Sequence, residues 1–229
     1  MRRMIIAGVA VVVVLAGLFV VDGQARQSAA TAAATRIHDS LGSADMPSVS
    51  IGGWPFLPTL VTKKVAGLDA TLTKALLPIE GGGVLTLDDV TFKGTDVTLG
   101  SGRPVVAALA TLSGTASYSN MSLFVKKNIY KDSSGMVGID TGATVNGHMV
   151  DVKVTGHPMV DPSSSAILLA EAKVMANGVD VTAKVDPQER AQLWPMMRLT
   201  LADGLRVRDL AIGERGITLD FSGTNVLMG

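Results

Sequence analysis

The residue types that could support catalysis or metal binding are few and scattered along the chain. The three histidines are His38, His148 and His157, and the last two flank an expected strand. Asp151 and Asp161 lie near them in sequence, but the spacing of these four matches no metal-ligand motif. The chain has no cysteine, which excludes disulfides, thiol catalysis and thiolate metal sites. We therefore predict no metal site and no cofactor.

Nucleophile and phosphate-loop motifs are also missing from the sequence. No serine lies in a G-x-S-x-G turn. Asp88 and Asp89 are adjacent on an expected strand, so their side chains point to opposite faces and one site cannot easily use both. The three glycines at 81–83 precede an expected strand, whereas a phosphate loop precedes a helix. The sequence therefore favours a protein that is not an enzyme, although folding could still assemble a His/Ser/Asp set.

The overall composition excludes one class of partner and favours strands. Lysine plus arginine and aspartate plus glutamate both total 20, so the formal net charge is zero. Broad nucleic-acid binding normally needs a basic face, so we predict no nucleic-acid partner. Hydrophobic residues make up 47% of the chain but aromatic residues only 4%, which suits β-strands better than aromatic stacking platforms.

An apolar N-terminal segment predicts export from the cytoplasm. Residues 4–21 form an unbroken apolar run of 18 residues behind Arg2 and Arg3, and this length just spans a bilayer. The small residues in the segment 23–25 also suit a signal peptidase, so cleavage is the alternative to an uncleaved anchor. The positive charges stay inside in both cases. We expect the protein on the periplasmic side, anchored to the inner membrane by residues 4–21 or released after signal cleavage.

We divide the chain into three parts. Residues 1–25 are the signal or anchor segment. Residues 26–41 lie in an Ala-rich stretch with good helix composition, and they form either a helical stalk or a first helix packed on the domain. Residues 42–229 are a β-rich domain of short strands separated by glycines.

Two segments of the β-rich part resemble each other. Residues 85–99 align without gaps to residues 205–219, and apolar residues coincide along the alignment. Each segment is interpreted as two strand pieces joined by a glycine-containing turn. A change of alternation near Asp89 or Asp209 predicts a β-bulge. The pair indicates a repeated hairpin, and the alternative is that unrelated hairpins use the same residue types.

Short helices are expected between the strands, at 54–62, 120–129 and 187–196. The last one begins with a capping box in which Asp186 is the N-cap. Strands are expected at 105–117, 136–140, 143–155, 165–176 and 179–185. The dipeptide Asn177-Gly178 predicts a tight hairpin turn before the last of them.

Two pairs of lysines lie beside apolar helix faces. Lys63 and Lys64 follow the first expected helix, and Lys126 and Lys127 lie in the second. We interpret each pair either as a solvated edge or as groups that contact anionic lipid headgroups.

The two tryptophans each precede a proline and adjoin an apolar helical patch. They are Trp54 and Trp194. Core packing is one interpretation, and an amphipathic ring at a groove mouth or membrane interface is the other.

Several short segments, taken in order, resemble a known family. They are IGGWPFL at 51–57, LTLDDV at 85–90, ASYSNM at 116–121, GLRVRDLAI at 204–212 and GITLDF at 216–221. Together with the export leader they resemble the LmeA-like phospholipid-binding proteins of the mycobacterial and actinobacterial cell envelope. The resemblance extends over residues 36–226. The chain departs from the pattern at Trp54 and Pro58, and its low aromatic content thins any aromatic lining.

The resemblance implies a β-rich α+β fold. The expected architecture is an elongated, curved antiparallel sheet wrapped around short helices, like one half of a tubular, BPI-like lipid-binding fold. Phospholipid binding in an apolar groove and support of envelope lipid or lipoglycan synthesis are also implied. The physics agrees, because an acyl chain covering apolar strand faces contributes about 0.8 kcal/mol per buried methylene. The expected partners are a phospholipid or other acyl lipid, the membrane and an envelope biosynthesis protein.

We therefore expect an extracytoplasmic phospholipid-binding or lipid-carrier protein that is not an enzyme. One alternative is a non-enzymatic envelope adaptor that binds another protein through a β-edge, and a second is an envelope hydrolase. The expected groove residues are apolar side chains of the short helices and the closing strand: Trp54, Phe56, Leu57, Leu60, Phe124, Val125, Leu193, Trp194, Leu219 and Phe221. The expected headgroup contacts are Lys63, Lys64, Lys126 and Lys127.

Overall fold

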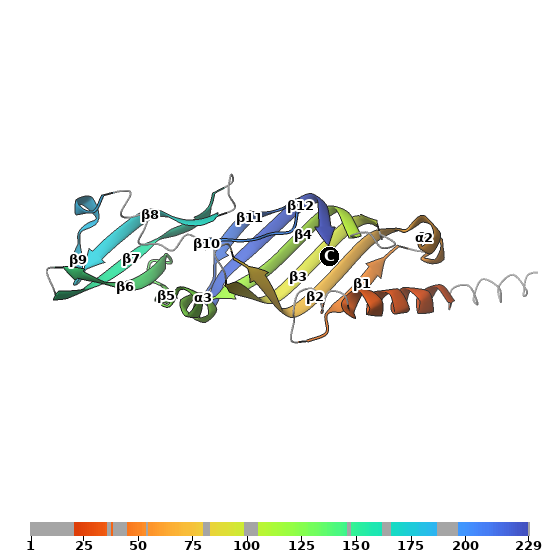
Figure 1. Cartoon of the computed structure of the whole chain (residues 1–229), viewed down its shortest axis with the longest axis horizontal. Helices are drawn as coiled ribbons and strands as arrows, with labels where there is room; N and C mark the ends of the chain where they lie inside the picture. The colour runs from red at the N-terminus through yellow and green to blue at the C-terminus, as the bar shows by residue number, and fades with distance from the viewer. Residues whose placement is uncertain are drawn as a thin grey trace, which may run out of the picture.

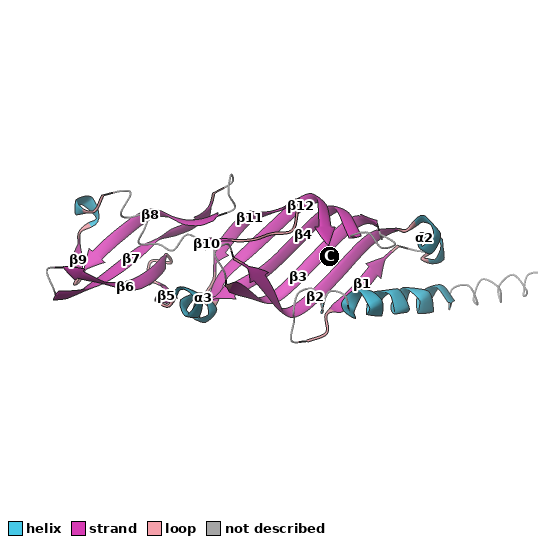
Figure 2. Ribbon diagram, viewed as in Figure 1, coloured by secondary structure: helices cyan, strands magenta, loops and turns pink. Residues whose placement is uncertain are grey.

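The chain forms an elongated, mostly antiparallel β structure with few helices. The computed structural model describes residues 21–35, 38, 45–53, 55–79, 83–98, 105–145, 148–161, 166–186 and 197–228. Two open sheets follow one another along the long axis (Figure 1). Figure 2 shows that strands make up most of the molecule and that the helices lie at its ends and junctions. The predicted β-rich α+β class is confirmed, with the strands divided between two sheets.

The first sheet is fully antiparallel and contains the longer strands. In spatial order its strands are β1 (Ser48–Gly52), β2 (Lys64–Pro78), β3 (Val84–Thr98), β4 (Val105–Ser117), β12 (Gly216–Met228) and β11 (Leu205–Ile212). The C-terminal strand β12 therefore lies between β4 and β11, in the interior of the sheet. Strand β4 has the bounds expected from the sequence.

The second sheet is shorter and is also antiparallel. Its order is β10 (Met197–Arg198), β8 (Ala166–Ala176), β7 (His148–Val160), β6 (Val137–Val145) and β5 (Asn128–Lys131), and β9 (Val179–Asp180) pairs with β8. Strand β6 continues through Gly142, which pairs with Asp151, so the strand break expected there is wrong. A glycine in a strand interior permits pairing as long as a partner strand satisfies its backbone.

The turn after β8 is the hairpin that the sequence predicts. Asn177 and Gly178 have φ of 48° and 81°, as a two-residue hairpin turn of this type requires. The strand expected at 179–185 is wrong beyond Asp180, because a 3-10 turn follows at Thr182–Lys184. The Thr182 hydroxyl accepts a hydrogen bond from the Val174 amide at 2.8 Å, and this side-chain contact replaces further strand pairing.

Alternation along the strands gives the first sheet one apolar face. On β2, Leu68, Ala70 and Leu72 are buried, whereas the intervening Asp69 and Thr71 are exposed. Side chains of a strand point alternately to the two faces, so burial of one face explains this pattern.

Two interruptions of the alternation are β-bulges, as the sequence predicts. The register of β3 against β4 shifts between Asp88 and Thr91, and Asp89 has a φ of 53°. The register of β11 against β12 shifts between Val207 and Asp209. An extra residue at each bulge keeps apolar side chains on one face across the shift.

The interpretation of the two similar segments as repeated hairpins is half wrong. Residues 205–219 do form a hairpin, of β11 and the start of β12. In the first segment β3 runs without a turn through Gly94, which pairs with Leu68 on one side and Ala110 on the other. Strands on both sides hold Gly94 extended, a tertiary effect that local turn chemistry does not reveal.

One continuous hydrophobic core extends over both sheets. It runs from Phe56 and Val65 in the first sheet region to Val154 and Val174 in the second. The N-terminal helix, residues 21–35, packs on it through the small side chains of Ala25, Ala29 and Ala30. This helix is continuous across residues 25 and 26, where we expected the signal or anchor segment to end and the next part to begin. Leu199, which follows β10, also belongs to this core. It forms an isolated antiparallel β-bridge with Ile79, the residue after β2.

Two short helices lie at opposite ends of the first sheet (Figure 1). Helix α2 (Leu57–Thr62) lies within the range expected at 54–62. Helix α3 (Tyr118–Val125) begins earlier than the expected 120–129, because Ser117 caps it through the Asn120 amide at 3.3 Å. Residues after 127 form β5 instead of helix. The helix expected at 187–196 lies outside the described residues.

Candidate functional site

Helix α3 ends in a lysine with an unusual backbone conformation. Lys126 is the C-cap of the helix, with a φ of 54°, and its amide donates to the Ser122 carbonyl. Glycine or asparagine usually occupies such a left-handed position, because a Cβ carries a steric cost there. Lys127 follows directly, and its amide also donates to the Ser122 carbonyl, at 3.3 Å. Two cationic side chains are thus held at the end of an uncharged helix.

The Ser122 side chain stabilises this turn. Its hydroxyl accepts a hydrogen bond from the Ile129 amide at 2.8 Å and donates to the Tyr118 carbonyl at 2.7 Å. The helix, the lysine turn and the start of β5 are therefore connected by one side chain. This arrangement orders the backbone from which both lysine side chains extend.

A shallow, widely open depression of about 700 Å³ lies beside this turn. It is lined by Ser119, Ser122, Leu123, Lys126, Lys127, Asn128 and Ile129. Leu123 is 78% exposed, whereas Ile129 is buried in the core. An exposed large aliphatic side chain beside two lysines can contact an acyl chain and an anionic headgroup at the same place.

The opposite face of α3 packs on the core. Met121 is buried, and Phe124 and Val125 are half-buried against the core cluster. The ring of Phe124 lies against the backbone of Gly83, where an added Cβ would come within 2.5 Å of the ring. Gly83 also has a φ of 120°, which favours glycine for a second reason. The Phe124 ring is therefore positioned by a glycine.

Helix α2 repeats the features of α3 at the other end of the first sheet. Its residue Val61 is 84% exposed, and its C-cap Lys63 has a φ of 56°. The Lys63 amide donates to the Thr59 carbonyl at 2.6 Å, and Lys64 follows with an exposed side chain. Each helix is thus uncharged, presents an exposed aliphatic residue, and ends in a left-handed lysine followed by a second lysine.

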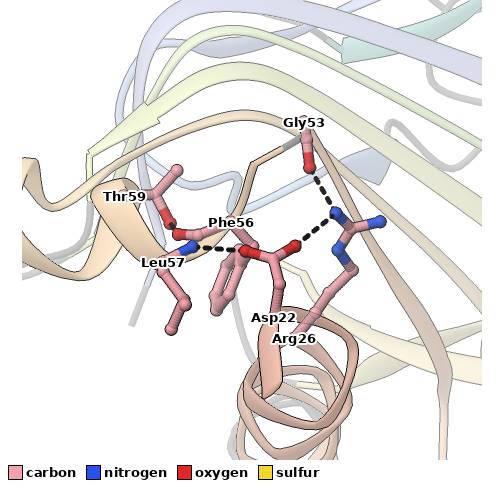
Figure 3. A network of polar contacts seen from close by, with 6 residues as sticks. All are labelled: Asp22, Arg26, Gly53, Phe56, Leu57 and Thr59. Carbon is pink, nitrogen blue, oxygen red and sulfur yellow. Dashed lines mark hydrogen bonds and ion pairs between the residues drawn. The ribbon is translucent and has the colours of Figure 1, made fainter. Parts of the chain in front are cut away.

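A buried carboxylate connects α2 to the N-terminal helix (Figure 3). Asp22 is 4% exposed, and its side chain accepts a hydrogen bond from the Leu57 amide at 2.7 Å. Arg26 donates to the other Asp22 oxygen at 3.3 Å and to the Gly53 carbonyl at 2.6 Å. We missed this network from the sequence. The signal was an acid followed four positions later by a base on an expected helix, which is the spacing of an i,i+4 ion pair.

The expected groove residues do not gather at one point. Phe56, Leu219 and Phe221 are fully buried core residues, while Leu57, Phe124 and Val125 are half-buried. They distribute into three places, at α2, at α3 and along β12. Four others are not placed, because Trp54, Leu193 and Trp194 lie outside the described residues and the side chain of Leu60 is not described. The groove assignment stays a prediction.

The expected headgroup lysines divide between two places. Lys63 and Lys64 lie at the end of α2, and Lys126 and Lys127 lie at the end of α3. The two pairs are at opposite ends of the first sheet, so they cannot contact one small ligand together (Figure 1).

Two tyrosines near α3 have raised pKa values. Burial, and then the charge of Asp140, raise the pKa of Tyr130 to about 12. Burial, and then Glu214, also raise the pKa of Tyr118, whose hydroxyl donates to the Gly213 carbonyl at 2.9 Å. Within the described ranges, no three His, Asp or Glu side chains form a group that could hold a metal. His157 is exposed on β7.

A second depression is polar and lies on the face of the first sheet that is opposite its buried apolar face. Its volume is about 400 Å³, and its lining includes Lys93, Arg208, Asp209 and Asp220 with several threonines and serines. Its acidic and basic groups balance, so it lacks the excess positive charge and the exposed aliphatic residue found at α3.

The structure combines two open antiparallel sheets, one continuous hydrophobic core and a lysine-bordered depression at α3. The comparison with protein families names the group. The model of the LmeA-like phospholipid-binding family matches residues 20–222, so the chain belongs to this family. The resemblance predicted from short segments is confirmed. Neither the curated proteins nor the solved structures gave a match to the chain.

Family membership supports phospholipid as the ligand class. In the part of the chain that the structure describes, no helix is both long and apolar enough to cross a membrane.

Proposed function

We propose that this protein binds phospholipid on the periplasmic side of the membrane, as a carrier that supports envelope lipid or lipoglycan synthesis. Residues 4–21 hold it to the inner membrane. Support comes from the family match and from the apolar run behind Arg2 and Arg3. The observation that carries the proposal is the depression at α3, where exposed Leu123 adjoins two lysines beside the core.

In this proposal the α3 turn holds the lipid headgroup. The phosphate lies against Lys126 and Lys127, whose backbone is already ordered by Ser122. The acyl chain covers Leu123 and extends towards Ile129, which lines the same depression. Each methylene removed from water contributes about 0.8 kcal/mol, so a few methylenes offset the ordering of the chain. No bond is made or broken, so no catalytic group is required.

The test is lipid capture by the full chain. The protein is purified, and lipids that copurify are identified by mass spectrometry. Phospholipid at near-stoichiometric amounts that is lost in Leu123→Asp supports the proposal. Leu123→Ser is the matched control, because it shortens the exposed side chain without adding charge. Wild-type protein that carries no lipid and takes none from liposomes contradicts the carrier and favours the adaptor.

A separate substitution tests the hydrolase alternative. His157 is exposed on β7 and does not line the depression at α3, so His157→Ala should leave lipid capture unchanged. Loss of function in a folded His157→Ala protein would favour an enzyme.

A further inference from the structure

The contact between the N-terminal helix and α2 defines which end of the molecule faces the membrane. Asp22 is the first residue after the apolar run 4–21. Its carboxylate oxygen is 2.7 Å from the Leu57 amide, in the first turn of α2. Helix α2 therefore lies beside the point where the apolar run ends. If residues 4–21 span the bilayer, α2 lies at the headgroup level.

Several contacts make this attachment rigid. Asp22 is buried, and Arg26 bridges it to the Gly53 carbonyl at 2.6 Å (Figure 3). Further along the same helix Ala29 and Ala30 pack on the hydrophobic core. A helix held by hydrogen bonds at its first turn and by packing along its length cannot rotate independently of the sheet.

The surface of α2 has the composition of a membrane-contact surface. Val61 is 84% exposed, and it lies four residues after Leu57, which is about 6 Å along a helix. The hydroxyls of Thr59 and Thr62 donate to carbonyls within the helix, at 2.5 Å and 3.3 Å, so they need no water partner. The helix contains no acidic residue.

Two lysine side chains border this surface. Lys63 and Lys64 are exposed at the end of the helix, within about one helix turn of Val61. An aliphatic side chain flanked by lysines suits the boundary between acyl chains and anionic headgroups, because lysines near such a surface are attracted to its negative charge.

We propose that Val61, Lys63 and Lys64 dock on the surface of the anionic membrane that holds the apolar run, and that Asp22 and Arg26 fix this orientation. The proposal rests on the proposed anchoring of residues 4–21. The first sheet then extends away from the membrane, and α3 and the second sheet lie at the distal end (Figure 1). The α2 lysines contact the membrane, whereas the α3 lysines contact the single bound lipid.

The absence of cysteine from the chain gives a direct test. Val61→Cys in the full chain is labelled with an environment-sensitive fluorophore and reconstituted into phosphatidylglycerol-containing vesicles that carry a nitroxide quencher at headgroup depth. Val179→Cys on β9 is the matched control, because Val179 is also an exposed valine, 62% exposed, at the opposite end of the molecule. We expect quenching at position 61 and none at 179.

The role of the buried ion pair is tested on the same labelled protein. Asp22→Ala and, separately, Arg26→Gln should reduce quenching at position 61 while the protein still floats with the vesicles. Gln24→Ala, an exposed change on the same helix, should leave quenching unchanged. Arg26→Gln keeps the buried carboxylate and the α2 hydrogen bond, so it remains informative where Asp22→Ala disturbs folding.

The contrary outcomes are distinct. Vesicle-bound protein with no quenching at position 61, or with equal quenching at 61 and 179, overturns the orientation and leaves lipid binding intact. Undiminished quenching in both Asp22→Ala and Arg26→Gln overturns the role of the ion pair. Protein that does not float with vesicles overturns the anchoring itself, and with it this inference.

Discussion

Asp22 and Leu57 are 35 positions apart in the sequence, and the carboxylate of Asp22 accepts the hydrogen bond of the Leu57 amide. This contact supplies a partner to one of the amides in the first turn of α2, which no preceding helical residue can satisfy. Arg26 balances the buried charge from the same helix. One carboxylate thus stabilises two elements that would otherwise meet only through apolar packing.

Removal of this carboxylate should destabilise the fold. Asp22→Ala leaves the Leu57 amide without its partner and Arg26 without its counter-charge, so we expect a loss of about 2 kcal/mol in the free energy of unfolding. Thermal melting of the full chain in detergent, followed by circular dichroism, measures it. Gln27→Ala on the same helix is exposed and should change the melting temperature little. Equal stability of the Asp22→Ala protein and the wild type would show that the contact contributes nothing.

Substitution by a charged side chain should distinguish groove residues from core residues, because only a core substitution should strongly reduce stability. Phe56→Asp places a carboxylate where the wild-type ring is completely buried, and we expect a loss of at least about 3 kcal/mol in stability. Phe124→Asp should retain most of the stability, because the ring is half-buried, but should lose lipid binding. Melting temperature and bound lipid are measured on both proteins. If both variants unfold alike, Phe124 is a core residue and the groove assignment at α3 is wrong.

The lysines at α3 should contribute affinity through charge. Lys126→Gln with Lys127→Gln removes two cations, and at about 1 kcal/mol each the affinity for anionic phospholipid should fall roughly 30-fold. Titration with a soluble short-chain phosphatidylglycerol at low and high salt measures the effect, and added salt should shrink it. Lys173→Gln with Lys184→Gln, both exposed on or near the second sheet, is the matched control. Equal affinity of the two double variants would place the headgroup elsewhere.

A single methyl group at Gly83 should displace the Phe124 ring. Gly83→Ala adds a Cβ at 2.5 Å from the ring in a backbone with φ of 120°. Gly135→Ala is the control, since its φ is 83° but nothing lies within 4 Å of its added Cβ. Both carry backbone strain of about 1 kcal/mol, and only Gly83→Ala adds the clash. We expect Gly83→Ala to lose more stability than Gly135→Ala. We expect altered lipid occupancy only in Gly83→Ala. Equal effects would show that the ring moves aside freely.

The turn before β6 should weaken in acid. Hydrogen bonds from Ser134, together with those from the Met136, Ser134 and Gly135 amides, hold the pKa of Asp132 below its ordinary value of 3.8. A carboxylate with a lowered folded pKa stabilises the fold above the unfolded pKa and loses this effect as the pH falls through the folded value. Asp132→Asn should therefore melt lower than wild type at pH 7, and the difference should narrow below pH 4. A difference independent of pH would assign the effect to geometry alone.

Much of the fold is local and could be read from the residues. The bulge at Asp89 was predictable because alternation has a period of two, so an inserted residue shows directly as a change of phase. The hairpin at Asn177-Gly178 was predictable because two consecutive residues with positive φ require such types. The order of short segments was sufficient to indicate the family, although each segment alone was weak.

Other features depend on contacts between distant segments. Gly94 stays in a strand because β2 and β4 pair with β3 on both sides of it. The backbone hydrogen bonds to these two strands outweigh the local preference of glycine for a turn. Helix α3 begins early because Ser117, the last residue of β4, caps it. The lysine pairs were found from their spacing, but their separation to opposite ends of the first sheet was not.

By itself the sequence determined the strand-rich class, the positions of the bulges, the lysine pairs beside uncharged helices and the apolar run before Asp22, because each is a property of neighbouring residues. Only the tertiary structure decided that Asp22 meets Leu57, that Phe124 rests on Gly83 and that Leu123 lies beside a depression. The first two of these contacts join residues far apart in the chain. Their energies come from burial and hydrogen bonding that exist only once the sheets have assembled.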